Sequence, residues 1–201
     1  MPDEEVQERG REGVGMVKAW LEATTWMEFP VNAYEDGLRC TVPLLSGKKK
    51  FDLRGHHLGD KHQRRALSVE CKRYTTKGGQ LKEYRRFLAI AYSYHAKQIE
   101  LLGGAVDEDF LWVTSNPFDN TKVAWTHLRT EEHLLDALAD EANADVLGDG
   151  HEIDEKLARK VAASIWLLVF DERQMDVTLT AGELKKVMTV LEREGPGLWQ
   201  H

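Results

Sequence analysis

The chain has 201 residues, of which 42% are hydrophobic and 30% are charged, as is ordinary for a single globular domain with a sizeable core. No apolar run approaches the roughly 18 residues of a membrane span, and the charged N-terminus does not resemble a secretory signal, so we expect a cytoplasmic protein without a membrane partner. With only Cys40 and Cys71, a disulfide framework and a four-thiolate cluster are excluded.

Charge is spread unevenly along the chain, whose formal net charge is −7. Residues 46–97, here called the basic block, hold 14 Lys or Arg against 4 Asp or Glu, whereas the remaining residues hold 13 against 30. A basic block in an acidic protein predicts one surface that faces a polyanion. The alternative is that exposed charges cluster there by chance.

The first element expected is a helix over residues 4–24, because its apolar side chains recur at helical spacing. Glycines weaken this helix unless its start packs closely against another backbone or a ligand. Glu8 and Glu12 lie four positions apart on one face, and either could point into a site formed by the following sheet. The alternative is a solvated acidic first turn.

Alternation and turn residues then predict a series of strands, with residues 46–50 as a basic loop. These strands are expected at residues 26–32, 38–45, 50–58, 65–73 and 110–114, with one more strand or an extended segment at 123–128.

The clearest strand covers residues 65–73, where apolar and polar side chains alternate. This alternation places Glu70 and Lys72 on one face. Cys71 is expected to point toward the core rather than to act as a nucleophile, since no histidine partner is near it in the sequence. Asp52 is carried by the preceding strand.

These residue types suit the hydrolysis of a phosphodiester, which needs an activated water and a clamp on developing charge; a divalent cation supplies both. Magnesium keeps several waters, so the carboxylates of Asp52 and Glu70 and the backbone carbonyl of Cys71 suffice as ligands. Lys72 would orient the attacking water or stabilise the charged phosphate.

A long amphipathic helix is expected over residues 80–102. Gln80 and Tyr84 stack on one of its faces, where they could hold a substrate phosphate or orient the lysine. Arg73 and Lys77, from the basic block, are further substrate-binding candidates.

Asp…Glu-x-Lys on consecutive strands, with a glutamate-bearing helix before and a helix after, resembles the PD-(D/E)XK nuclease superfamily. Residues 80–84 (QLKEY) also resemble the Gln-x-x-x-Tyr motif of its RecB-type and lambda-exonuclease branch, and the resemblance covers roughly residues 8–114. It implies an α/β fold with a restriction-endonuclease-like central mixed sheet flanked by helices, Mg²⁺ or Mn²⁺ as cofactor, and cleavage of DNA. By the same resemblance the site consists of Asp52 and Glu70 as metal ligands, Lys72 as the catalytic lysine, Gln80 and Tyr84 as substrate-binding residues, and Glu12 (or Glu8) as the first-helix carboxylate.

The segment between Asp52 and Glu70 is expected to contain a long basic hairpin loop, which could contact DNA. Its three histidines could be zinc ligands or DNA contacts, but solvated loop histidines are more frequent where no cysteines accompany them. They are His56, His57 and His62.

Beyond a nuclease-like core of residues 1–128, we expect an acidic helical extension, residues 129–201, packed on the core or at a subunit interface. Residues 152–170 are predicted to be helical, and their end, WLLVF at 166–170, is expected in the core or else at that interface.

We therefore predict a metal-dependent nuclease that hydrolyses DNA phosphodiester bonds, acting alone, as a homodimer or in a larger nuclease or defence complex. A catalytically silent nucleic-acid-binding or assembly subunit with the same fold is the alternative. A small-molecule enzyme using the same carboxylates is disfavoured by the basic block. DNA against RNA, endonucleolytic against exonucleolytic attack, and a role in phage defence, repair or a mobile element all stay open.

Overall fold

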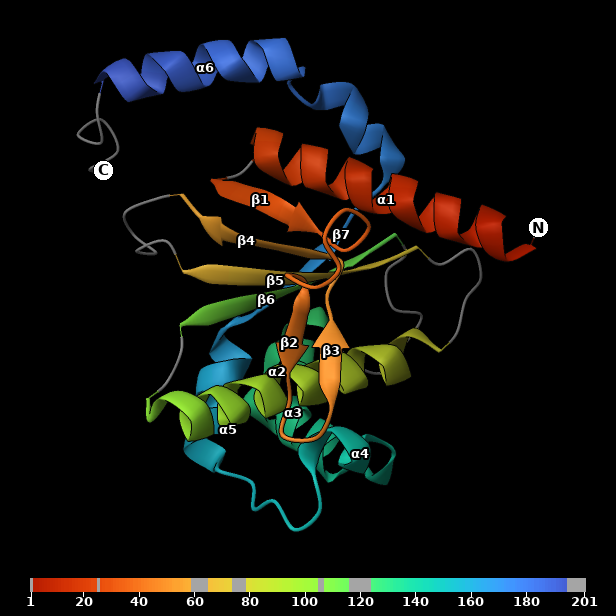
Figure 1. The fold of residues 1–201 in the computed structure, drawn as a ribbon, viewed down its shortest axis with the longest axis vertical. Helices are drawn as coiled ribbons and strands as arrows, with labels where there is room; N and C mark the ends of the chain where they lie inside the picture. Colours follow the sequence, from red (N-terminus) through yellow and green to blue (C-terminus); the bar gives the residue numbers. More distant parts are fainter. Residues whose placement is uncertain are drawn as a thin grey trace.

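The computed structural model describes residues 2–24, 26–58, 65–73, 79–104, 107–115 and 124–194. Within them lie a mixed sheet of five strands and a separate two-stranded sheet, with helices on both sides (Figure 1). The strands are β1 (Met27–Asn32), β2 (Thr41–Pro43), β3 (Lys48–Lys50), β4 (Leu53–His57), β5 (Ala66–Lys72), β6 (Glu108–Thr114) and β7 (Ile165–Val169). The helices are α1 (Pro2–Thr24), α2 (Gln80–Leu102), α3 (Glu131–Ala139), α4 (Ala144–Leu147), α5 (Glu155–Ala163) and α6 (Ala181–Glu194), with 3-10 turns η2 (Trp125–Arg129), η3 (Glu141–Asn143) and η4 (Glu172–Val177).

The main sheet has the order β1-β4-β5-β6-β7. β1, β4 and β5 are antiparallel neighbours, whereas β5, β6 and β7 run parallel. Parallel neighbours need long crossovers, and α2 supplies the one from β5 to β6. The expected α/β architecture with a mixed sheet flanked by helices is therefore confirmed.

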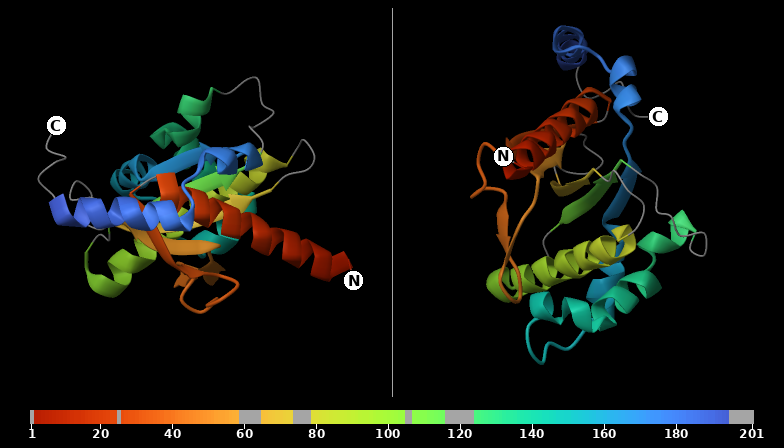
Figure 2. Two further views of the ribbon diagram at one scale, coloured as in Figure 1. Left: turned by 90° about the horizontal axis from the view of Figure 1, so that it is seen from above. Right: turned by 90° about the vertical axis from the view of Figure 1, so that its right-hand side faces the viewer.

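Helices cover the two faces of the sheet in separate layers, as the edge-on view in Figure 2 shows. α1 packs on one face, against apolar side chains of β4, β5 and β6. α2 packs on the other face, with α3, α4 and α5 outside it. β6 is buried along its whole length between these layers, as expected for a central strand.

β2 and β3 form a hairpin that is separate from the main sheet and lies beside α2 (Figure 1). The prediction of a loop at 46–50 was therefore wrong for residues 48–50, and the strand at 38–45 is shorter than expected. Val42 and Leu44 are buried in the same apolar cluster as α2, which holds the hairpin in place. Gly47, at φ 81°, makes the turn between the strands.

The prediction of one helix over 152–170 was wrong at its C-terminal end. α5 ends at Ala163, and the next residues form β7, which pairs with β6. A short apolar run such as residues 165–169 is compatible with a buried strand as well as with a helix. It forms a strand here because it can pair with the free edge of β6. A strand from the predicted extension thus belongs to the main sheet. The segment 123–128 was also predicted incorrectly, since η2 begins at Trp125.

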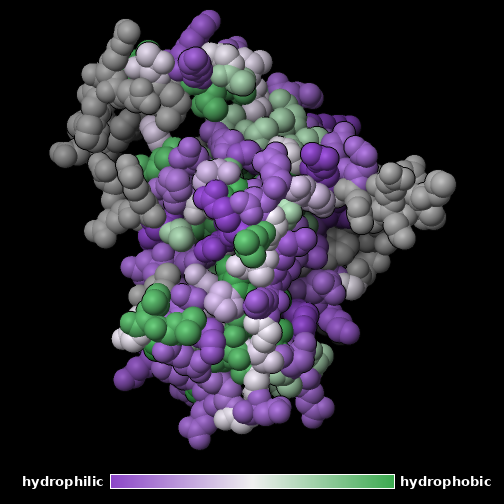
Figure 3. Space-filling model, viewed as in Figure 1, coloured by the Kyte–Doolittle hydropathy of each residue, from purple (hydrophilic) through white to green (hydrophobic). Residues whose placement is uncertain are grey.

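The molecular surface seen in Figure 3 is mostly hydrophilic. Apolar side chains are exposed at the end of α2, where Leu101 and Leu102 lie. Among the described helices, none combines the length and apolar character required to cross a membrane.

Candidate active site

The candidate site lies where β4 begins and β5 ends. Leu53 pairs with Val69 where β4 begins, and the N–H of the preceding residue, Asp52, donates to the carbonyl of Val69 at 3.0 Å. Glu70 follows Val69 on β5, close enough to Asp52 for its charge to raise the pKa of that carboxyl. The fold thus brings two carboxylates together that are far apart in the sequence.

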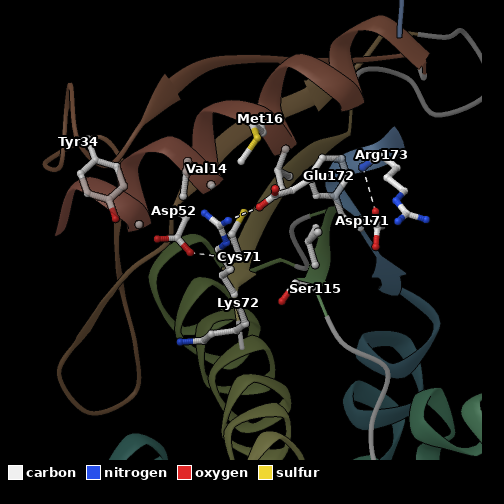
Figure 4. Close-up of a pocket in the computed structure, with 16 residues that line it drawn as sticks. Val14, Met16, Tyr34, Asp52, Cys71, Lys72, Ser115, Asp171, Glu172 and Arg173 are labelled. Carbon is white, nitrogen blue, oxygen red and sulfur yellow. Dashed lines mark hydrogen bonds and ion pairs between the residues drawn. The ribbon is translucent and has the colours of Figure 1, made fainter. Parts of the chain in front are cut away.

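The backbone of Cys71 adds polar groups beside Asp52. Its N–H donates to Oδ2 of Asp52 at 2.7 Å (Figure 4). The carbonyl of the next residue, Lys72, accepts from the N–H of Ser115 at 2.9 Å, on the β6 side of the strand. Because successive backbone groups of a strand point to opposite sides, the carbonyl of Cys71 is directed toward the β4 side, where Asp52 lies.

Glu70 is buried, with 6% of its surface exposed, and its carboxylate lies between two lysines. Nζ of Lys72 is 3.0 Å from Oε1, which places both residues on one strand face as predicted. Nζ of Lys49 is 2.8 Å from Oε2. Lys49 comes from β3 and was not among the predicted site residues, because nothing in a run of three lysines indicates which of them faces inward.

The electrostatic environment of Asp52 is unusual for a carboxylate. Burial, followed by the neighbouring charge of Glu70, raises the pKa of Asp52 to about 6, against the opposing effects of the Cys71 N–H, Lys49 and Lys72. A carboxylate whose charged form is disfavoured by burial and by a neighbouring carboxylate is stabilised by a cation placed beside it.

The thiol of Cys71 is not poised for nucleophilic chemistry. Burial raises its pKa well above the ordinary value, and the charges of Asp52 and Glu70 raise it further. It packs against the apolar cluster under α1, as the strand pattern predicts.

A cavity of about 400 Å³ adjoins Asp52 and Lys72. It lies between α1, the ends of β5 and β6, and the beginning of η4 (Figure 4). Gly10 and Gly13 form part of its α1 wall. A Cβ on Gly10 would lie 2.6 Å from Oη of Tyr34, so the close packing expected around the helix glycines exists at this position.

Tyr34 also lines this cavity and was missed from the sequence, where it appeared only as part of a turn. Burial and then the charge of Asp52 raise the pKa of its phenol. The neutral hydroxyl can donate a hydrogen bond to an anionic ligand in the cavity.

A second cavity, of about 190 Å³, lies on the α2 side of Lys72. Its polar wall comes from both sheets and from α2. The charged residues along it are Lys48, Lys49, Glu70, Lys72, Glu83 and Arg86. Lys72 therefore borders both cavities, and the positive charges outnumber the negative ones in the second.

Neither of the predicted first-helix carboxylates is brought to Asp52. Glu8 and Glu12 are both exposed, and neither lines the cavity. Each lies two positions from Gly10, about 200° around the helix axis, so the face of α1 that turns to the cavity excludes them. The choice of Glu12 or Glu8 as a metal ligand is therefore corrected.

Tyr84 is a core residue, with none of its surface exposed. Its hydroxyl donates to the carbonyl of Leu128 at 2.9 Å, and its ring meets that of Trp112 edge-on at 5.5 Å. The same Trp112 ring lies near the catalytic lysine candidate, with Nζ of Lys72 5.9 Å from its centre. Tyr84 thus packs against Trp112, the ring next to Lys72, and its burial keeps it from contacting a substrate directly. Gln80, one turn earlier, is also buried.

Of the remaining predicted residues, Arg73 lines the larger cavity and forms an ion pair with Glu172 from η4. Lys77 and His62 lie outside the described residues.

The other two histidines are not in a solvated loop, because β4 continues through them. His57 is buried, 3.0 Å from Asp109, and His56 lies 3.2 Å from Glu28. Their contacts are therefore those of sheet residues, and the expectation of loop histidines was wrong at these positions.

The donor set fits a hard divalent cation. Within the described ranges, no three or more His, Cys, Asp or Glu side chains gather to hold a metal ion. Magnesium does not need them, since it binds through one or two carboxylates and keeps several waters. Asp52, Glu70 and the Cys71 carbonyl supply that smaller set.

No family model, curated protein or solved structure matches this chain.

Proposed function

We propose that this protein is a metal-dependent nuclease with the restriction-endonuclease-like fold, and that it hydrolyses DNA phosphodiester bonds. The observation that carries the proposal is the meeting of Asp52, Glu70, the Cys71 backbone and Lys72 at the adjoining ends of β4 and β5. The order of α1, three antiparallel strands, α2 and a parallel strand agrees with this fold.

Each residue has a role that follows from its position. Asp52, Glu70 and the Cys71 carbonyl would hold Mg²⁺ or Mn²⁺, which when bound activates water and neutralises phosphate charge. Lys72, on the same face as Glu70, donates hydrogen bonds to the attacking water or to a phosphate oxygen. The ring of Trp112 under its Nζ limits where the ammonium group can lie.

A polyanionic substrate is supported by the charge around the site. Lys48 is exposed on β3, and Arg73 is exposed at the end of β5. The smaller cavity beside Glu70 is lined by further cations. Phosphate contacts of this kind supply most of the affinity of a protein for a nucleic acid.

The test is cleavage of linear and circular DNA in the presence of Mg²⁺ or Mn²⁺. Asp52→Asn and Lys72→Met should each lower the rate by a factor on the order of 10² or more. Lys156→Met, an equal change of charge on the exposed side of α5, should leave it unchanged. Cleavage that persists in both site variants would refute the assigned site.

A silent nucleic-acid-binding subunit is the second candidate, and one observation favours it. Both oxygens of Glu70 are occupied by lysines, an arrangement that also suits a purely structural charge cluster. This alternative predicts DNA binding that weakens with salt and no cleavage with any divalent metal.

A further inference from the structure

Lys49 reaches the site from outside the main sheet. Its strand, β3, pairs with β2, in which Val42 opposite Lys49 is buried. The hairpin is fixed to α2 by a hydrogen bond from the Leu45 N–H to Oγ of Ser93, 2.9 Å long. The position of Lys49 is therefore set by the packing of the hairpin.

Of the three lysines of β3, the middle one forms the ion pair with Glu70. Lys48 and Lys50 are exposed, whereas Lys49 is partly buried, because successive side chains of a strand point to opposite sides. Its Nζ lies 2.8 Å from Oε2 of Glu70, whose side chain is 8% exposed. An ion pair this far out of water is stronger than one on the surface.

An ammonium group at this distance lowers the affinity of the same carboxylate oxygen for a metal ion, because the two cations repel each other. Oε1 of Glu70 faces Lys72, the lysine with the catalytic role, and Oε2 faces Lys49. Lys49 has an alternative place for its charge, since the cavity that it lines is also lined by the acidic residue Glu83. It can therefore leave Glu70 without entering an apolar environment.

We propose that Lys49 competes with the divalent cation for Glu70, so that the β2–β3 hairpin sets the metal affinity of the site. The inference rests on the proposed nuclease function. While the metal is absent, Lys49 neutralises Glu70. When the metal binds, Lys49 is released into the cavity shared with Lys48 and Arg86, where it faces substrate phosphate.

The experiment is calorimetric titration of Mn²⁺ into the full-length protein, without DNA and at fixed ionic strength. Lys49→Met should lower the Kd for Mn²⁺ about tenfold, the size expected for removing one competing ion pair from a partly buried carboxylate. Lys49→Arg keeps the charge and should stay within about twofold of the wild-type Kd.

Lys50→Met is the matched control, because it removes the same charge from the neighbouring exposed position of β3. It should change the Kd by no more than about twofold, since exposed charges are screened. Lys49→Gln serves as a second variant if Lys49→Met does not give a cooperative thermal transition.

The outcomes separate the two proposals. A Kd for Mn²⁺ that is equal in the wild-type protein, Lys49→Met and Lys50→Met overturns the competition while leaving a metal site. Equal tightening by Lys49→Met and Lys50→Met also overturns it, because the effect is then one of general charge. Absence of Mn²⁺ binding to both the wild-type protein and Lys49→Met overturns the nuclease proposal and the competition with it.

Discussion

Asp52 lies in the candidate site, and its burial there destabilises the folded protein at neutral pH. Its pKa of about 6 lies above the ordinary 3.8, because burial and Glu70 disfavour the charged form. The folded protein therefore holds a proton more tightly than the unfolded chain does. The contribution of Asp52 to stability is greatest below pH 3.8 and is lost as the pH rises to about 6.

Replacing Asp52 by Asn should remove this loss. At pH 7 the free energy of unfolding of Asp52→Asn should exceed that of the wild-type protein by about 1–3 kcal/mol, and the difference should vanish near pH 4. Urea unfolding at the two pH values measures both quantities. Mg²⁺ should raise the Tm of the wild-type protein only, since the variant lacks a ligand. A less stable variant at pH 7 would contradict the expectation.

Tyr84 shows how a residue of a functional motif can be structural. Tyr84→Phe removes the hydrogen bond to Leu128 and should lower the free energy of unfolding by about 1 kcal/mol. DNA cleavage at a temperature where both proteins are folded should stay within about twofold of wild type, because the ring still supports Trp112. A large loss of cleavage without a loss of stability would instead show direct contact with substrate.

At the scale of the elements, α1 turns Gly10 and Gly13 toward the cavity and leaves Glu8 and Glu12 exposed. The glycines differ in their surroundings. Gly10 lies against the Tyr34 hydroxyl, whereas a Cβ on Gly15 would meet nothing within 4 Å. The requirement for glycine is thus local to the cavity side of the helix.

These two positions form a matched pair for mutation. Gly15→Ala should raise the free energy of unfolding by about 0.5–1 kcal/mol, the ordinary gain in helix propensity. Gly10→Ala should gain less or lose stability, because Tyr34 must move out of its place beside Asp52. Thermal unfolding of both variants checks this prediction. Equal gains would mean that the Tyr34 contact contributes nothing.

At the scale of the whole molecule, the C-terminal part is built into the fold. β7 pairs with β6, and side chains of α3 and α5 are buried in the same cluster as those of α2. α6, by contrast, lies on the far side of α1 from the sheet (Figure 1). The region from α3 to β7 therefore completes both the sheet and one of its covering layers.

A fragment of residues 1–128 should consequently fail to fold. Without β7 and the outer helices it would expose one edge of β6 and the apolar side of α2. We expect no cooperative thermal transition and binding of a hydrophobic dye, in contrast to the full chain. A fragment that unfolds cooperatively would show that the core is independent of the rest.

The sequence by itself determined that Glu70 and Lys72 lie on one face of the same strand. It also determined the α/β order of elements. These follow from alternation and helical spacing over short stretches, which depend little on distant contacts. Only the tertiary structure decided which face of α1 meets the cavity, that Tyr84 enters the core, that residues 165–169 form β7, and that Lys49 reaches Glu70. Each of these depends on contacts between segments far apart in the chain, and local periodicity carries no information about such partners.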